Sequence, residues 1–380
     1  MQYPSPTSPR RLGTGALAAL VAVVVAQAQA QDIPVVSIQA ETGAAAFAAA
    51  NYQKAIQLAV EQANSQGGIN GHKINLITRD NASDKGQAIN LANQAIDRDR
   101  AVLVLGPSST TDSMATAPIF NDKKVPNLSF VTSDAILKAG TWSMKFQQSP
   151  AVITPLVAKY VLEKTPARKA ALVFDRTNEA LIDSKNIFRD AFKAGGGTVV
   201  SEEAIINTDA NFQPLATKLK ALDVDAVYIS AFTEQSANLV VQLRQAGLSD
   251  KVRMIGALSL ASPKFVSTVG KAGEGTIAVT DHIIGVDRPL NKAFEAAWKT
   301  RYGTEPDSWS AIGYSLAAVG LAALKEAGPN PTREKVHDAF GRLRDVPILG
   351  GSGLWNQTDR KPYFGAMVLI LKDGKFIVAP

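Results

Sequence analysis

The sequence has no cysteine and only three histidines among its 380 residues, at positions 72, 282 and 337. Without cysteine the chain can form neither a disulfide framework nor a lipid anchor on a thiol. The three histidines lie far apart, so a zinc site would need ligands that converge from distant positions. We therefore expect neither a metal centre nor a cofactor.

Signatures of catalysis are also lacking. Ser352 lies in a glycine-rich run, but no strand–turn–helix pattern surrounds it, as a nucleophile elbow requires. Neither a phosphate-binding loop nor a dinucleotide Gly-x-Gly-x-x-Gly pattern follows the first predicted strand, and Gly195-Gly196-Gly197 is better explained as a helix stop. Asp80, Asp84 and Asp97 are expected to be solvated or to cap helices. The sequence therefore predicts that the protein is not an enzyme.

Positive charge is present but is not concentrated. The chain has 40 Lys and Arg against 34 Asp and Glu, and positive and negative charges are interspersed, with no arginine-rich arm. This pattern gives no support to nucleic-acid binding. The composition, 46% hydrophobic and 19% charged, is that of globular protein. A chain of this length usually needs more than one hydrophobic core, so we expect two domains.

The N-terminal thirty residues have the order of features found in secretory signals. Arg10 and Arg11 precede an uninterrupted apolar run, Ala16–Ala26, and Ala28 and Ala30 then offer small-residue cleavage sites. The run has 11 residues, too few to cross a bilayer, which takes about 20. A short core helix is the alternative, but it would show polar positions at helical spacing. Residues 1–30 are thus predicted to be a signal peptide, which leaves an exported, soluble chain.

The rest of the chain alternates short β-branched runs with helical patterns. For example, Ala101–Leu105 is followed by a helical stretch at 111–121, and the alternation restarts after residue 150. Residues 276–284 are predicted to be a strand that leads out of this second unit. The last hundred residues add strong helices and a hairpin signal at Asp373-Gly374. Such alternation predicts an α/β fold with parallel strands and right-handed crossovers.

Two clusters of small polar residues follow successive predicted strands. Gly106–Thr111 comes after the strand at 101–105, and Val131–Asp134 comes after the strand at 127–130. Open parallel sheets bind ligands beyond the carboxyl ends of their strands. Hydroxyl groups and free N–H groups at a helix start can donate to a carboxylate. For any single residue helix capping is the simpler explanation, but the two clusters together predict ligand contact.

The order of these motifs resembles the periplasmic solute-binding proteins of branched-chain amino-acid transport. The most specific stretch is Ala59–Gly71 (AVEQANSQGGING), and the Gly-Pro-Ser-Ser run at 106–109 also matches. Tyr314 in a late helix and the turn Asp373–Phe376 fit the same pattern. The resemblance covers nearly all of the chain after the predicted signal peptide.

The resemblance implies a type I binding-protein fold, in which two Rossmann-like lobes with parallel central sheets are joined by three crossovers. The first lobe would comprise residues 32–149 and 282–349, and the second would comprise 150–281 and 350–380. One small solute would be enclosed between them. The family also implies a periplasmic location, a membrane permease and ATP-hydrolysing subunits as partners, and a monomer, since lobe closure itself supplies the site.

Site residues follow from the resemblance position by position. The family holds the solute carboxylate with a hydroxyl and backbone N–H groups of the first lobe, which Thr110, Ser109 and residues 131–133 match. Aromatic positions of the family are matched by Phe47 and Phe232. The full set of predicted contacts is Phe47, Ser108, Ser109, Thr110, Val131, Thr132, Ser133, Glu179, Phe232 and Leu258.

One position departs from the family. Leu258 stands near the place of the acid that pairs with the α-ammonium group in amino-acid binders, and Glu179 or Asn178 stands where the family has a tyrosine. A buried ammonium group without a counter-charge is costly. Either Glu41, Glu179 or Asp281 replaces the missing acid, or the ligand is an aromatic or aliphatic acid without an amino group.

We therefore expect the solute-binding component of an ABC importer that captures an amino acid or another small carboxylate-bearing solute. A ligand sensor in a signalling system, built on the same module, is the alternative. It is disfavoured because no transmembrane or output segment is evident in the sequence.

Overall fold

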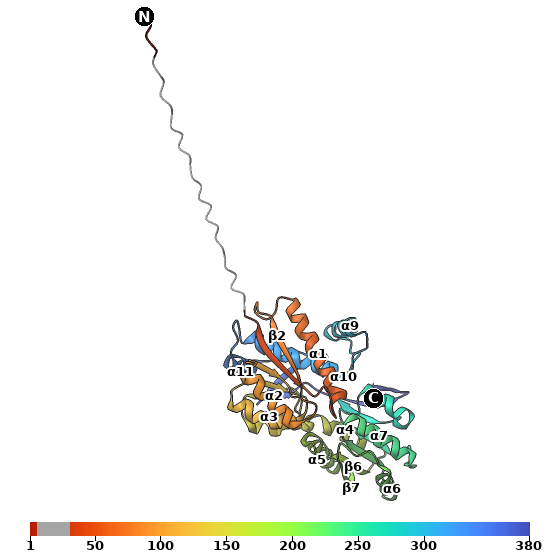
Figure 1. The fold of residues 1–380 in the computed structure, drawn as a ribbon. Helices are drawn as coiled ribbons and strands as arrows, with labels where there is room; N and C mark the ends of the chain where they lie inside the picture. Colours follow the sequence, from red (N-terminus) through yellow and green to blue (C-terminus); the bar gives the residue numbers. More distant parts are fainter. Residues whose placement is uncertain (6–30) are drawn as a thin grey trace. The chain divides into compact units, whose positions relative to one another are not determined.

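Two β-sheets organise the computed structural model of the chain, which describes residues 1–5 and 31–380 (Figure 1). The apolar run and cleavage sites of the predicted signal peptide therefore lie outside the described residues. Residues 31–380 form one unit with its own internal contacts. Among the described residues, none of the helices combines the length and the hydropathy that a bilayer crossing requires.

The first sheet has five parallel strands in the order β2-β1-β3-β4-β5. Helices α1, α10 and α11 cover one face of it, and α2 and α3 cover the other. Because both faces are covered, the side chains of β1, β3, β4 and β5 are almost all buried, including polar ones such as Asn127 and Lys145. The elements are β1 (Ile33–Gln39), α1 (Ala46–Ser65), β2 (Ile74–Asp80), α2 (Lys85–Asp97), β3 (Leu103–Leu105), α3 (Thr110–Asp122), β4 (Asn127–Ser129), β5 (Ser143–Lys145), α9 (Pro289–Tyr302), α10 (Ser308–Glu326) and α11 (Arg333–Arg342).

The second sheet has seven strands in the order β15-β14-β10-β9-β8-β6-β7, of which β6 to β10 are parallel. The predicted hairpin is confirmed, since β14 and β15 pair antiparallel around Asp373-Gly374. Helices α4 and α5 cover one face, and α6, α7 and α8 cover the other. The elements are α4 (Pro150–Lys164), β6 (Lys169–Asp175), α5 (Glu179–Ala194), β7 (Thr198–Ile205), α6 (Gln213–Ala221), β8 (Ala226–Ser230), α7 (Thr233–Gln245), β9 (Arg253–Gly256), α8 (Pro263–Val269), β10 (Ile277–Thr280), β14 (Met367–Lys372) and β15 (Lys375–Val378).

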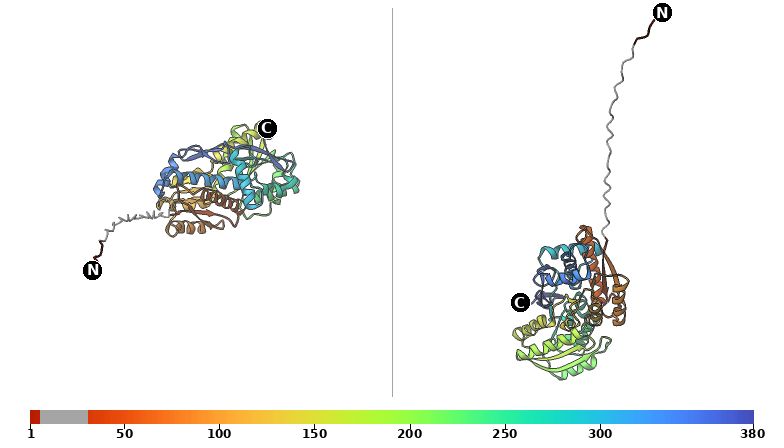
Figure 2. Two further views of the ribbon diagram at one scale, coloured as in Figure 1. Left: turned by 90° about the horizontal axis from the view of Figure 1, so that it is seen from above. Right: turned by 90° about the vertical axis from the view of Figure 1, so that its left-hand side faces the viewer.

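The chain passes between the two sheets three times, after β5, after β10 and before β14. Figure 2 shows the orange segments and the blue helices together in one lobe and the green segments in the other. The predicted fold class, an α/β protein of two lobes with parallel central sheets, is therefore confirmed. A small sheet of β11 (Val346–Pro347), β12 (Leu354–Thr358) and β13 (Lys361–Tyr363) adjoins the third passage.

The lobe limits drawn from the sequence stay a prediction. Trp355 and Phe364 pack in the core of the first lobe, whereas the strands after them join the second sheet. The predicted strand at 276–284 is shorter in the structure and ends at Thr280. Its end coincides with the second passage, where Asp281 bonds to the ring of His282 and to the amide of Gln148 instead of continuing the sheet.

Helices α1 and α10 lie in close contact. A Cβ atom added at Gly313 would lie 2.6 Å from the Cα of Tyr52, so glycine is what permits this approach. The two helices then place Tyr52 and Trp309 with their ring centroids 5.9 Å apart. This packing builds one wall of the site described next.

Candidate functional site

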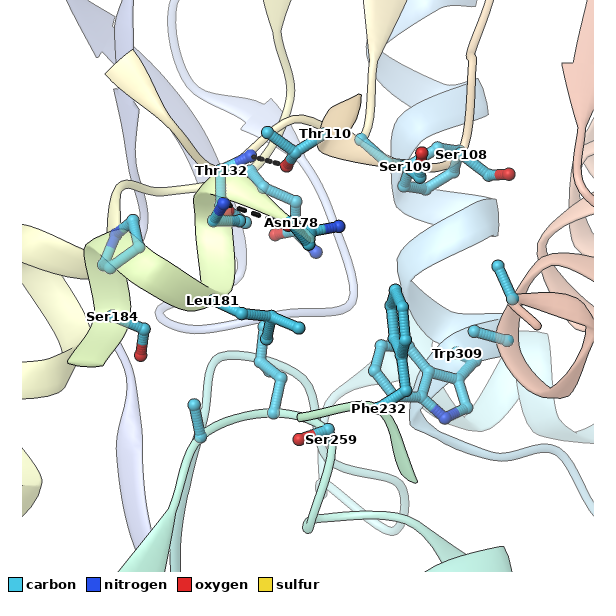
Figure 3. Close-up of a pocket in the computed structure, with 18 of the residues that line it drawn as sticks. Ser108, Ser109, Thr110, Thr132, Asn178, Leu181, Ser184, Phe232, Ser259 and Trp309 are labelled. Carbon is cyan, nitrogen blue, oxygen red and sulfur yellow. Dashed lines mark hydrogen bonds between the residues drawn. The ribbon is translucent and has the colours of Figure 1, made fainter. Parts of the chain in front are cut away.

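A cavity of about 150 Å³ lies between the two lobes, at the ends of strands where helices begin (Figure 3). The first lobe lines it with α1, the β3–α3 turn, the segment after β4 and the start of α10. The second lobe lines it with the starts of α4 and α5 and the segments after β8 and β9. A cavity of this size can hold a molecule of about the size of a benzene ring.

The start of α3 forms one end of the cavity. Ser109 caps the helix, and its hydroxyl accepts from the N–H of Asp112 at 3.1 Å. The N–H groups of Thr110 and Thr111 have no acceptor within the helix, because the first turn lacks preceding carbonyls. Gly106, with φ of 111°, sets this turn: a Cβ there would lie 2.2 Å from the carbonyl oxygen of Ile38. The helix dipole and free N–H groups make this end suitable for an anion.

The second polar cluster meets the first at this end. The N–H of Thr132 donates to the hydroxyl of Thr110 over a long 3.4 Å, and both residues line the cavity (Figure 3). Ser108 lines it as well, and its hydroxyl accepts from the N–H of Ala40 at 2.8 Å. The structure thus brings together side chains that the sequence placed on two successive strand ends.

Three predicted contacts do not line this cavity in the described chain. Val131 is fully buried in a small apolar cluster behind it. The hydroxyl of Ser133 donates to Asp183 of α5 at 2.7 Å. Glu179 accepts from the hydroxyl of Thr111 at 3.3 Å. Their roles as ligand contacts stay predictions.

An aromatic wall forms another side of the cavity, and we define it as Phe47, Tyr52, Phe130, Phe232 and Trp309. Tyr52 and Phe130 stack with centroids 4.0 Å apart, and Trp309 meets both Tyr52 and Phe47 edge to face. Phe232 comes from the second lobe and contacts Phe47 with centroids 6.0 Å apart. Both lobes therefore contribute to one continuous apolar surface.

The sequence had predicted Phe47 and Phe232 but not the other three aromatic residues. Phe130 directly precedes the second polar cluster, and this position in the sequence could have identified it as a lining residue. Tyr52 and Trp309 gave no such signal, because they come together only through the packing of α1 on α10.

The second lobe faces this surface with short and neutral side chains. Asn178, which precedes α5, lines the cavity, as do Leu181 and Ser184 of α5 and Leu258 and Ser259 after β9. Of the two residues that stand where the family has a tyrosine, Asn178 therefore faces the cavity and Glu179 does not. Asn178 also caps α5 by accepting from the N–H of Ala180.

Two buried polar atoms on lining residues have no hydrogen-bond partner among residues 31–380. They are Oε1 of Gln147 and Nε1 of Trp309. An unpaired buried polar group costs about 1–3 kcal/mol, so a ligand that bonds to either one gains from it.

A buried cation lies behind the polar end. The side chain of Lys145 on β5 is wholly buried, and its Nζ donates to the carbonyl oxygen of Thr132 at 2.6 Å and to Asp134. Burial lowers the pKa of Lys145, although the bond to Asp134 opposes this effect. Among the described residues, no group of three or more metal-binding side chains is present.

Comparisons with known proteins agree with this architecture. The sequence pattern of the family described as "Periplasmic binding protein" matches residues 32–375. The Leu/Ile/Val-binding protein of Escherichia coli K12 is 25% identical over 349 residues, which cover 91% of this chain and 92% of that protein.

Solved structures show the same fold. A leucine-binding protein from Thermotoga maritima matches with a TM-score of 0.83 at 23% identity, covering 92% of this chain and 98% of that one. A solute-binding protein of an ABC transporter from R. palustris, in complex with benzoate, matches with a TM-score of 0.82 at 19% identity, covering 91% and 95%.

Proposed function

The chain belongs to the periplasmic binding protein family, and from this we propose that it is the extracytoplasmic solute-binding component of an ABC importer. Its solute would be a small carboxylate-bearing molecule, held in the cavity between the lobes. The relatives support this, since one is named for binding leucine, isoleucine and valine and another was solved with benzoate. All of these ligands carry a carboxylate.

The observation that carries the proposal is the meeting of the α3 start with the Thr132 segment at one end of a cavity that also has an aromatic wall. A carboxylate placed there would accept from the Thr110 hydroxyl, the free N–H groups of α3 and the N–H of Thr132. These charge-assisted bonds would replace the long 3.4 Å bond between the two threonines. The aromatic wall would then cover the apolar body of the solute.

Both lobes line the cavity, so binding and closure are coupled. Closing the lobes removes water from the solute and strengthens the hydrogen bonds that hold it. Opening would release the solute to a permease, with ATP-hydrolysing subunits driving transport. Because one chain supplies both walls, a monomer is sufficient for this role, and the site needs to bind without turning the solute over.

The first test is a thermal-shift screen of the chain from Gln31 onward, with amino acids, aromatic acids and aliphatic acids. A solute that binds the folded chain raises its melting temperature as the solute concentration rises. We expect such a rise with at least one carboxylate and none with its carboxamide. A flat response to every carboxylate would contradict the proposed function.

Thr110→Val tests the carboxylate grip directly. The variant keeps the shape of the side chain but removes the donor, so we expect the Kd for the best solute to rise about tenfold to a hundredfold. Thr116→Val is the matched control, because this buried hydroxyl on the same helix donates to carbonyl oxygens of α3 itself. Equal losses of affinity in the two variants, measured by calorimetry, would argue against the grip.

A further inference from the structure

The side chains that line the cavity carry no charge, although they come from both lobes. They are hydroxyls, amides, alanines, aliphatic chains and aromatic rings. An α-amino acid brings a carboxylate and an ammonium group into such a site together. The carboxylate has donors at the α3 start, but the ammonium group would be buried without a counter-charge, which is costly.

The acids that could have served as that counter-charge are placed elsewhere. Asp281 is 1% exposed and bonds to His282 at 2.9 Å, beside the second passage between the lobes. Glu179 accepts from Thr111 at 3.3 Å. Glu41 is only partly buried, and it does not line the cavity. At the place where the family resemblance puts the acid, the apolar side chain of Leu258 faces the cavity.

Buried charges of both signs lie near the polar end. Asp112 in the first turn of α3 is 4% exposed, and its carboxylate accepts from the amide of Asn81 at 2.9 Å and does not line the cavity. Lys145 bonds to the Thr132 carbonyl and to Asp134, and Lys361 lies 3.3 Å from Asp134. Asp134 and Asp183 oppose the charge of Lys145, so the two lysines and two aspartates of this cluster leave no net negative charge to hold an ammonium group.

The aromatic wall is not arranged to replace a counter-ion. Tyr52 and Phe130 turn one face each toward the other at 4.0 Å, and Trp309 and Phe47 meet edge to face. Rings that hold a cation turn their faces toward it instead. The packed rings form an apolar wall that is suited to contact a ring or a branched chain.

We propose that the solute of this protein is a small monocarboxylate with an apolar, ring-sized body and no ammonium group. The proposal rests on the function proposed above and narrows it to aromatic or branched aliphatic acids. The departure at Leu258 is then a change of specificity rather than a loss of binding.

The decisive experiment compares matched pairs by calorimetry with the chain from Gln31: leucine against isocaproate, phenylglycine against phenylacetate, and phenylalanine against hydrocinnamate. Within a pair the two solutes differ only in the amino group. We expect the acid without it to bind at least about tenfold more tightly, because the buried ammonium group has no partner. Tighter binding of the amino acids, or of glycine betaine, would overturn the inference and leave the proposed function intact.

Leu258→Asp supplies the missing charge, and Leu258→Asn is its neutral control of the same shape. We expect the aspartate variant to shift preference toward the amino acid of each pair by about tenfold relative to the asparagine variant. An equal preference in both variants would overturn the electrostatic reason for the inference. If both variants fail to fold, the three solute pairs measured with the unaltered chain decide whether the inference holds. Binding of neither set would refute the proposed function itself, and the narrower inference with it.

Discussion

Lys145 is buried on β5 although lysine is among the residues least often found inside proteins. Its Nζ bonds to the Thr132 carbonyl and to Asp134, so this one side chain holds both residues of the segment after β4 in place. Removing one partner of a buried pair leaves the other unsatisfied. At the scale of single residues, the polar end of the cavity therefore depends on a side chain that does not line it.

Lys145→Met tests this positioning role. We expect it to raise the Kd of the best carboxylate about tenfold, since the Thr132 N–H is no longer held toward the cavity. Lys361→Met is the control, because Lys361 pairs with the same Asp134 at 3.3 Å but its side chain is 58% exposed, so its loss should matter less. Calorimetry and thermal unfolding on both variants separate affinity from stability. Unchanged affinity in Lys145→Met would contradict the role.

Helix α3 is the element that links sequence, fold and site. Ser109 caps it, Gly106 sets the turn before it, and its first residue, Thr110, lines the cavity. The residues that start this helix would also make the proposed anion site, which is why the sequence could not separate capping from ligand contact.

Ser109→Ala separates the two roles by comparison with another cap. Loss of an N-cap hydroxyl lowers the free energy of unfolding by about 1 kcal/mol. Thr332→Ala removes the cap of α11, which does not line the cavity, and we expect a similar loss of stability there. Only Ser109→Ala should also weaken solute binding, because the first turn of α3 then loses its fixed geometry. Denaturant unfolding and calorimetry give the two quantities.

At the scale of the whole molecule, hydrogen bonds join the two lobes across the cleft. Thr111 donates to Glu179 at 3.3 Å and Ser133 donates to Asp183 at 2.7 Å, and both acids belong to α5 of the second lobe. These two bonds can form only when the first lobe and α5 approach each other. They would stabilise the arrangement in which the proposed solute is enclosed.

Asp183→Ala should favour the open arrangement. Without solute we expect a larger radius of gyration in X-ray scattering than for the unaltered chain, and a Kd that is about threefold to tenfold higher. Asp190→Ala is the control on the same helix, since this residue bonds only to Arg189 at the surface. An unaltered radius and affinity in Asp183→Ala would show that the Ser133 bond does not govern closure.

Local patterns in the sequence determined much of the fold. The helix predicted at 111–121 is α3, which spans 110–122, and the strand predicted at 127–130 is β4, which spans 127–129, because these elements depend on their own residues and caps. Strand β5 and helix α8 were not predicted, since elements of three and seven residues carry too little periodic signal. The order of motifs was enough to identify the family, which the match over residues 32–375 confirms.

The sequence by itself also placed the hydroxyl clusters at strand ends and singled out Leu258. It could not determine that Asn178 faces the cavity and Glu179 does not, since the phase of α5 against the first lobe decides this. Nor could it assemble Tyr52, Phe130 and Trp309 into one wall, because they lie on three segments far apart in the chain. Local free energies fix where helices and strands begin, whereas the composition and charge of a cavity between lobes depend on packing over long sequence distances. Only the tertiary structure decides the latter.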